Sequence, residues 1–123
     1  MKTAEEILEK RRSEITEYLE KLRALVEKGD ILLSQITLEN NSVILEFNKT
    51  MNEYYHVTDL YNKWVDNLEP WIDINIDTRI AICQCHLDAL HLRKKGDMWE
   101  KEIAGEREID KRVRRAILSL HTI

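Results

Sequence analysis

The sequence predicts an all-α protein in which a single domain, residues 1–123, packs four long helices and one short helix around one core. Three observations predict this fold. Apolar residues recur at spacings of three and four over most of the chain, as side chains on one helix face do. The chain contains only three glycines and one proline, which suits long helices with short connections. Its 123 residues are the length of one domain.

Composition narrows the classes of function. Hydrophobic residues at 43% and charged residues at 34% describe a foldable chain, and the net charge of −4 argues against a general nucleic-acid coat. No apolar run reaches the roughly 18–20 residues that a bilayer crossing needs. The first residues are charged where a signal peptide would be apolar. We therefore expect a cytoplasmic protein with reduced cysteines.

The central helix is expected from Ser42 to Leu68. Its main stripe repeats at helical spacing and consists of Ile44, Phe47, Met51, Tyr54, Thr58, Tyr61, Val65 and Leu68. Val57, Leu60 and Trp64 widen this stripe, so the helix is expected to contact more than one neighbour. Pro70 ends it, because the residue before a proline avoids helical geometry. Residues 71–77 alternate apolar and polar, which indicates a short extended connection.

The first helix is expected from Thr3 to Lys28. Thr3 and Glu6 form a capping box, and Gly29 is a typical C-terminal stop. The inward stripe consists of Leu8, Ile15, Leu19, Leu22 and Val26, with Arg12 falling on it. Residues 30–41 are then expected to form a short helix capped by Asp30. A β-hairpin that begins in this segment and returns through residues 43–47 is the open alternative.

Two more helices are expected after Pro70. The first is capped by Asp77 and stopped by Gly96, and its inward residues are Ile80, Cys83, Leu87 and Leu90. The second opens with a capping box at Asp97 and Glu100. Its buried face is expected to contain Trp99, Ile103, Ile109, Val113, Ala116, Ile117 and Leu120.

Two charges interrupt the expected apolar stripes, Arg12 in the first helix and Glu106 in the last. A lone buried charge costs several kcal/mol, so each should be paired or lie near a bundle end. We expect them to set helix register or the choice of partner, a role that polar residues play in helical interfaces.

Apolar side chains exceed what one stripe per helix requires. The surplus residues are Tyr55, Leu60, Trp64, Trp71 and Met98, and aromatic and methionine side chains are typical interface anchors. The sequence therefore predicts a non-enzymatic protein-interaction or oligomerisation module without a cofactor, whose partner is another protein or a second copy. For Trp64, a place in a multi-helix core is an equal alternative.

Five acidic residues suggest an enzymatic alternative. Glu5, Glu6 and Glu9 are followed by Glu27 and Asp30, a pattern that resembles the Glu-Glu-x-x-Glu … Glu-x-x-Asp motifs of the MazG-like nucleotide pyrophosphohydrolases. The resemblance implies a helical enzyme whose carboxylates gather Mg²⁺ and activate water against a nucleoside triphosphate. That family places its two motifs on successive helices, whereas nothing between Glu9 and Glu27 breaks a helix. Solvated helix surface is the competing interpretation.

A basic patch near the C-terminus suggests RNA binding as a second alternative. It contains Lys111, Arg112, Arg114 and Arg115, charges that also complement the negative end of a helix dipole. Arg115 and His121 are similar to the Arg-x(4–6)-His element of HEPN ribonucleases. No aromatic residue is interleaved with these charges, so base stacking is not expected.

A metal site is not expected. Glu53 and His56 have the Glu-x-x-His spacing of di-iron bundle proteins. With Met51 and Tyr54 on the inward stripe, however, both potential ligands turn to the outer face. Cys83 is then most simply a small core residue.

Overall fold

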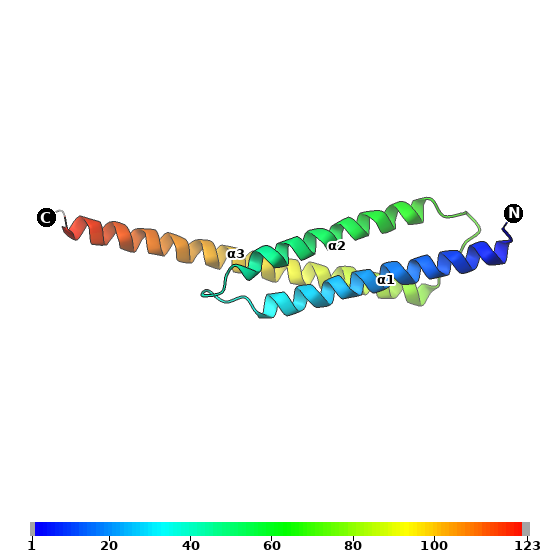
Figure 1. Ribbon diagram of the computed structural model, residues 1–123, viewed down its shortest axis with the longest axis horizontal. Helices are drawn as coiled ribbons and strands as arrows, with labels where there is room; N and C mark the ends of the chain where they lie inside the picture. The colour runs from blue at the N-terminus through cyan, green and yellow to red at the C-terminus, as the bar shows by residue number, and fades with distance from the viewer. Residues whose placement is uncertain (1, 122–123) are drawn as a thin grey trace.

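The computed structural model describes residues 2–121, apart from the side chains of Glu106 and His121. It contains α1 (Ala4–Ser34), α2 (Val43–Asp66) and α3 (Ile76–His121), of 31, 24 and 46 residues. Successive helices run in opposite directions, and the second half of α3 extends beyond the ends of the other two (Figure 1). The all-α prediction is confirmed. The prediction of four long helices and a short one is wrong, because three helices make up the described chain.

The first helix starts as predicted but continues past its expected stop. The Thr3 side-chain oxygen accepts a hydrogen bond from the Glu6 amide at 3.2 Å, which satisfies one free donor of the helix start. Gly29 lies buried inside α1. A Cβ added there would come within 3.3 Å of both Leu92 Cδ1 and Met51 Sδ. This glycine therefore permits three helices to approach closely and does not end the helix.

Neither prediction for residues 30–41 is correct. Residues 30–34 extend α1, and no strand occurs within residues 2–121. Residues 35–42 connect α1 to α2 as turns and bends, with Ile36 buried at the end of the core. The connection is held locally, since the amide of Asn40 donates to the side-chain oxygen of Thr37 at 2.9 Å.

The central helix is confirmed to within two residues of its predicted ends. Its buried side chains belong to one core that all three helices supply. Phe47 and Met51 are fully enclosed there, together with Leu22 of α1. Aromatic rings extend this core toward the far end of α2, where Tyr61 contacts Tyr18 edge to face at 5.7 Å between centroids.

The third helix is continuous where the sequence predicted two helices. Gly96 is buried within it, and a Cβ at that position would overlap the ring of Phe47. Asp97 and Glu100 are therefore interior helix residues and do not form a cap. At the start of α3, the side-chain oxygen of Asn75 accepts from the amide of Asp77 at 2.8 Å, so Asn75 is the cap in place of Asp77.

The predicted inward face of the first part of α3 is also wrong. Ile80, Leu87 and Leu90 are 60%, 51% and 54% exposed, and Cys83 is exposed too. The buried positions are instead Ile82, Cys85, Ala89 and Leu92, followed by Gly96. The face that packs is the one with the smaller residues, because it lets α3 approach Phe47 and α1.

The last part of α3 has no buried face among its described side chains. Ile103 is the last buried residue, because α1 and α2 do not reach further along α3 (Figure 1). Ile109, Val113, Ile117 and Leu120, which were expected inside, are all at least half exposed.

Arg11, rather than the predicted Arg12, pairs with the connection between α2 and α3 and so holds it against α1. Its Nη2 and Nε donate to the two carboxylate oxygens of Glu69 at 2.7 and 3.0 Å, and Nη1 donates to Glu14 at 2.9 Å. Glu14 also accepts from the Trp64 indole. Hydrogen bonding to Arg11 lowers the pKa of Glu69 to about 2. Arg12 points to solvent, with Glu9 at 4.0 Å.

The two glycines of α3 give a matched test of this packing. We expect Gly96→Ala to lower the free energy of unfolding by about 1–3 kcal/mol, because its Cβ overlaps the enclosed Phe47 ring. Gly105→Ala should raise it by up to about 1 kcal/mol, since nothing lies within 4 Å of an added Cβ. Urea unfolding of both variants measures the difference. Changes of the same sign in both would contradict the close contact at Gly96.

Candidate functional site

The outward side of α3 carries a continuous apolar surface, which we call the outer stripe. It consists of Ile76, Ile80, Cys83, Leu87 and Leu90. These residues follow alternating steps of four and three, so they line one helix face, roughly opposite the face that packs in the core. A shallow hollow of about 420 Å³ lies along the first four of them. The outer stripe therefore has both the spacing and the exposure of a surface that another helix can cover.

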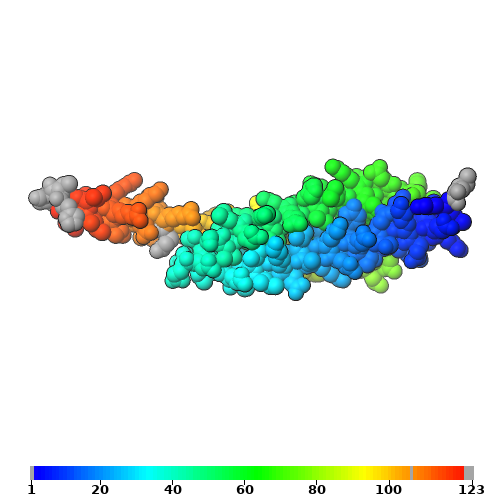
Figure 2. Space-filling model, viewed as in Figure 1, coloured from blue at the N-terminus to red at the C-terminus, as the bar shows by residue number. Residues whose placement is uncertain are grey.

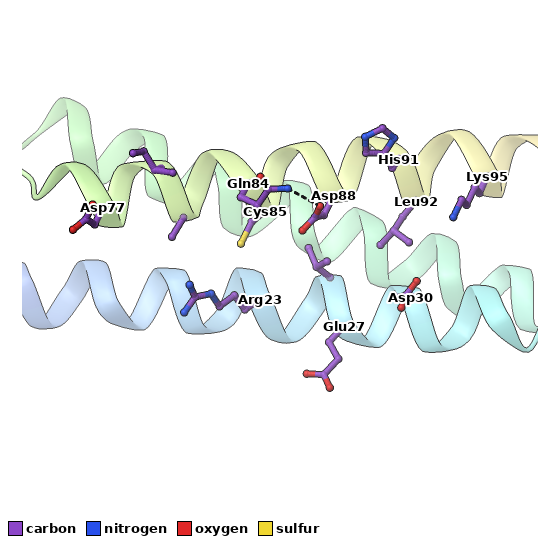
Figure 3. A pocket seen from close by; sticks show the side chains of 13 residues that line it. Arg23, Glu27, Asp30, Asp77, Gln84, Cys85, Asp88, His91, Leu92 and Lys95 are labelled. Carbon is purple, nitrogen blue, oxygen red and sulfur yellow. Dashed lines mark hydrogen bonds between the residues drawn. The ribbon is translucent and has the colours of Figure 1, made fainter.

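A groove of about 730 Å³ runs between α1 and α3 (Figure 3). Its apolar lining includes Val26, Ala81 and Leu92, and Ile80 joins it to the outer stripe. Charged and polar side chains are spread along both helices: Arg23, Glu27 and Asp30 on α1, and Asp77, Gln84, Asp88, His91 and Lys95 on α3 (Figure 3). Gln84 donates to Asp88 at 3.0 Å. The groove is thus an elongated surface with charges of both signs.

The groove's ionisable groups are spaced out rather than gathered. Asp77 and Asp88 are separated by three helical turns, about 16 Å. Within the described residues, no three His, Cys, Asp or Glu side chains lie together in a way that could hold a metal ion. The thiol of Cys85 is buried, and burial raises its pKa, which favours the protonated thiol over the nucleophilic thiolate.

A hydrogen bond between Tyr54 and His86 joins α2 to α3. The phenol oxygen lies 2.6 Å from the imidazole Nδ1. Burial raises the pKa of Tyr54 and lowers the pKa of His86, so both groups are neutral near pH 7. The imidazole tautomer decides which of the two groups donates. Tyr55 continues this cluster, since it contacts Tyr54 edge to face and lies under the Arg93 guanidinium at 5.8 Å.

The five residues predicted as a binding surface do not form one patch. Tyr55 and Trp64 pack partly against the core, whereas Leu60, Trp71 and Met98 are exposed. Trp71 lies in the connection between α2 and α3. Met98 borders a hollow near the C-terminal end of α1, whereas the connection that holds Trp71 is tied through Glu69 to Arg11, near the N-terminal end of α1.

The outer stripe was missed as a surface although its signal was visible. Ile80, Cys83, Leu87 and Leu90, which belong to this repeat, are the residues that the sequence analysis predicts to face inward. The true core face carries Ala89 and Gly96, which an apolar pattern weights weakly. The sequence analysis thus predicts the outer face as the one that packs, and it does not name the inner face.

The acidic residues of the pyrophosphohydrolase alternative all lie on α1 and are all exposed. Glu27 and Asp30 border the groove. Glu9 precedes Glu27 by five helical turns, about 27 Å. The structure therefore brings Glu27 and Asp30 to one surface and leaves Glu5, Glu6 and Glu9 away from it.

The basic residues Lys111, Arg112, Arg114 and Arg115 are exposed on the projecting part of α3. Arg112 lies 3.8 Å from Glu108, one turn earlier. The side chain of Glu106, predicted as a pairing charge, and that of His121 lie outside the part of the structure that is described. Their roles stay predictions.

Comparison with protein-family models, with curated proteins and with solved structures gives no match for this chain. Over the described residues, none of the helices combines the length and the apolar character that a membrane crossing requires.

His86 predicts a specific pH dependence of stability. Its pKa is lowered in the folded protein from the ordinary 6.5, so the unfolded chain takes up a proton first as the pH falls. The free energy of unfolding should therefore decrease as the pH drops through about 6.5 toward the lowered pKa. Urea unfolding between pH 8 and 5 should show this decrease in the wild type and a smaller one in His86→Gln. A matched substitution, His91→Gln, should retain the wild-type slope. An unchanged slope in His86→Gln would contradict the assignment.

Proposed function

We propose that the protein is a non-enzymatic helical interaction module that binds a protein partner through the outer stripe of α3. The observation that carries this proposal is the exposure of Ile76, Ile80, Leu87 and Leu90 on one helix face, each more than half accessible. Their spacing is that of the anchors by which one amphipathic helix docks on another.

Covering this surface would contribute substantially to binding. Complete burial of one Ile or Leu side chain stabilises by roughly 1.5–3 kcal/mol. Four such residues, each more than half exposed, therefore offer several kcal/mol on burial, from which the entropy cost of association is subtracted. Asp77 and Arg79 flank the stripe near its start and Lys94 follows its end. An apolar centre with a polar rim is the usual composition of a protein interface.

The fold itself does not require an apolar outer stripe. The core is completed by the opposite face of α3, through Ile82, Cys85, Ala89 and Leu92. A polar outer face would serve a three-helix structure equally well and would avoid contact of apolar surface with water. Large aliphatic residues there support a role in binding. The pyrophosphohydrolase alternative receives less support, because its five carboxylates are spread along α1.

Substitutions in the outer stripe should affect partner binding but not the stability of the fold, and one set of variants tests both. Ile80→Ser with Leu87→Ser should change the free energy of unfolding by less than about 1 kcal/mol, because both side chains are exposed. Leu92→Ala in the core should lose about 2–5 kcal/mol. A photoreactive residue at Leu90 should cross-link a defined protein in cells, and the serine pair should abolish that product. As a control, the photoreactive residue replaces Glu20, which is exposed on α1. Equal cross-linking from both sites would contradict the proposal.

A further inference from the structure

Residues 104–121 of α3 form a projecting arm. It extends about 27 Å, and apart from the two side chains outside the description, every residue in it is exposed. Figure 2 shows it as a thin rod that α1 and α2 leave uncovered. Ile109, Val113 and Ile117 lie along it at steps of four, each at least half exposed.

An uncovered arm of this kind lacks a source of stability. Isolated helices of this length are marginal in water, and most helical stability in proteins comes from packing an apolar face. Gly105 at its base costs about 1 kcal/mol relative to alanine. The arm's described intrahelical ion pair, between Arg112 and Glu108, is long at 3.8 Å and adds little. A partner that covers Ile109, Val113 and Ile117 would supply the missing packing.

The charges of the arm are divided into two blocks. Residues 104–110 hold three acids and one base, Arg107, whereas residues 111–121 hold four bases and no acid. The sign changes between Asp110 and Lys111, near the middle of the arm. A helix with one acidic half and one basic half is complementary to a copy of itself that runs in the opposite direction.

We propose that two copies of this chain pair through their arms in antiparallel orientation. The acidic half of each arm then lies along the basic half of the other, around a two-fold axis between Asp110 and Lys111. Ile109 and Val113 flank this axis within one turn, so the apolar residues of the two copies also meet at the centre. In this dimer, the three-helix part of each chain lies at one end and the paired arms lie between them.

A parallel pair is disfavoured by the same charges. It would set four bases against four bases and an acidic block against another, and like charges across an interface oppose association. The inference rests on the proposed function, since it names a second copy as one partner. It uses a surface separate from the outer stripe, which stays free for another protein.

Charge exchange tests the arm directly. Sedimentation equilibrium of the wild type should show a dimer that weakens as salt is added. Glu108→Lys with Asp110→Lys leaves Glu106 as the only acid among residues 104–121, and Arg114→Glu with Arg115→Glu makes acids outnumber bases there. Each double variant alone should shift at least tenfold toward monomer, and an equimolar mixture should recover a one-to-one dimer. Glu17→Lys with Glu20→Lys on the exposed side of α1 is the matched control and should dimerise as the wild type does.

Disulfide trapping tests the orientation. In a Cys83→Ser background, chains carrying Glu102→Cys are mixed with chains carrying Leu120→Cys. Glu102 lies seven residues before Ile109 and Leu120 seven residues after Val113, so both positions are in line with the apolar face of the arm and at nearly equal distances from the two-fold axis. An antiparallel pair should form disulfides mainly between unlike chains, whereas a parallel pair would join like chains.

The inference would be overturned by a folded wild type that stays monomeric at 100 µM, or by double variants that dimerise as the wild type does. A monomer whose arm binds single-stranded RNA in a salt-dependent way would assign the basic block to nucleic acid instead. A wild type that is monomeric but still gives the cross-link at Leu90 would refute this inference alone. A wild type that is dimeric but gives no cross-link at Leu90 would refute only the partner-binding proposal.

Discussion

The close approach of α3 to Phe47 is the constraint on which the rest of the structure depends. The ring of Phe47 occupies the space that any side chain at position 96 would fill. Gly29 gives α1 the same freedom beside Met51 and Leu92. The contact at Gly96 needs a missing Cβ, and the contact at Gly29 leaves only a tight space for one. Together they set the rotation and the axial position of α3 against the other two helices. A shift of α3 by one residue would bring a side chain against the aromatic ring.

This constraint decides which residues of α3 face water. Once Gly96 meets Phe47, Ile82, Cys85, Ala89 and Leu92 must follow on the same inner face. The larger aliphatic residues of α3 are then turned outward. The same alignment carries α3 past the ends of α1 and α2 and exposes its arm (Figure 1). Both surfaces offered for binding are therefore consequences of how the core is packed.

Two polar contacts beside the core also hold the helices and their connection in place. The Tyr54–His86 hydrogen bond links α2 to α3 at 2.6 Å, and the ion pair between Arg11 and Glu69 fastens the connection that precedes α3. The buried nitrogen and oxygen atoms of the described side chains all have partners. Such satisfied polar groups specify a single arrangement more than they add net stability.

The sequence predicted well what depends on local chemistry. The capping by Thr3, α2 to within two residues of its ends and the presence of a connection after Pro70 follow from residues close in the chain. It failed where a glycine's role depends on a distant neighbour. Glycine is a typical helix stop, so the sequence predicts helix ends at Gly29 and Gly96. Their contacts with Met51, Leu92 and Phe47 show instead that they lie where helices approach closely. The inward face of α3 failed for the same reason, because two apolar stripes compete and packing alone selects between them.

The reactivity of the two cysteines tests this arrangement most directly, because they lie on different faces of α3. Brief alkylation of the native protein with iodoacetamide, followed by mass spectrometry, measures each thiol separately. The structure predicts that Cys83, which is exposed, reacts readily and that Cys85, which is buried, is protected until the protein unfolds. Faster labelling of Cys85, or equal labelling of both in the folded protein, would contradict the packing of α3 and both binding surfaces derived from it.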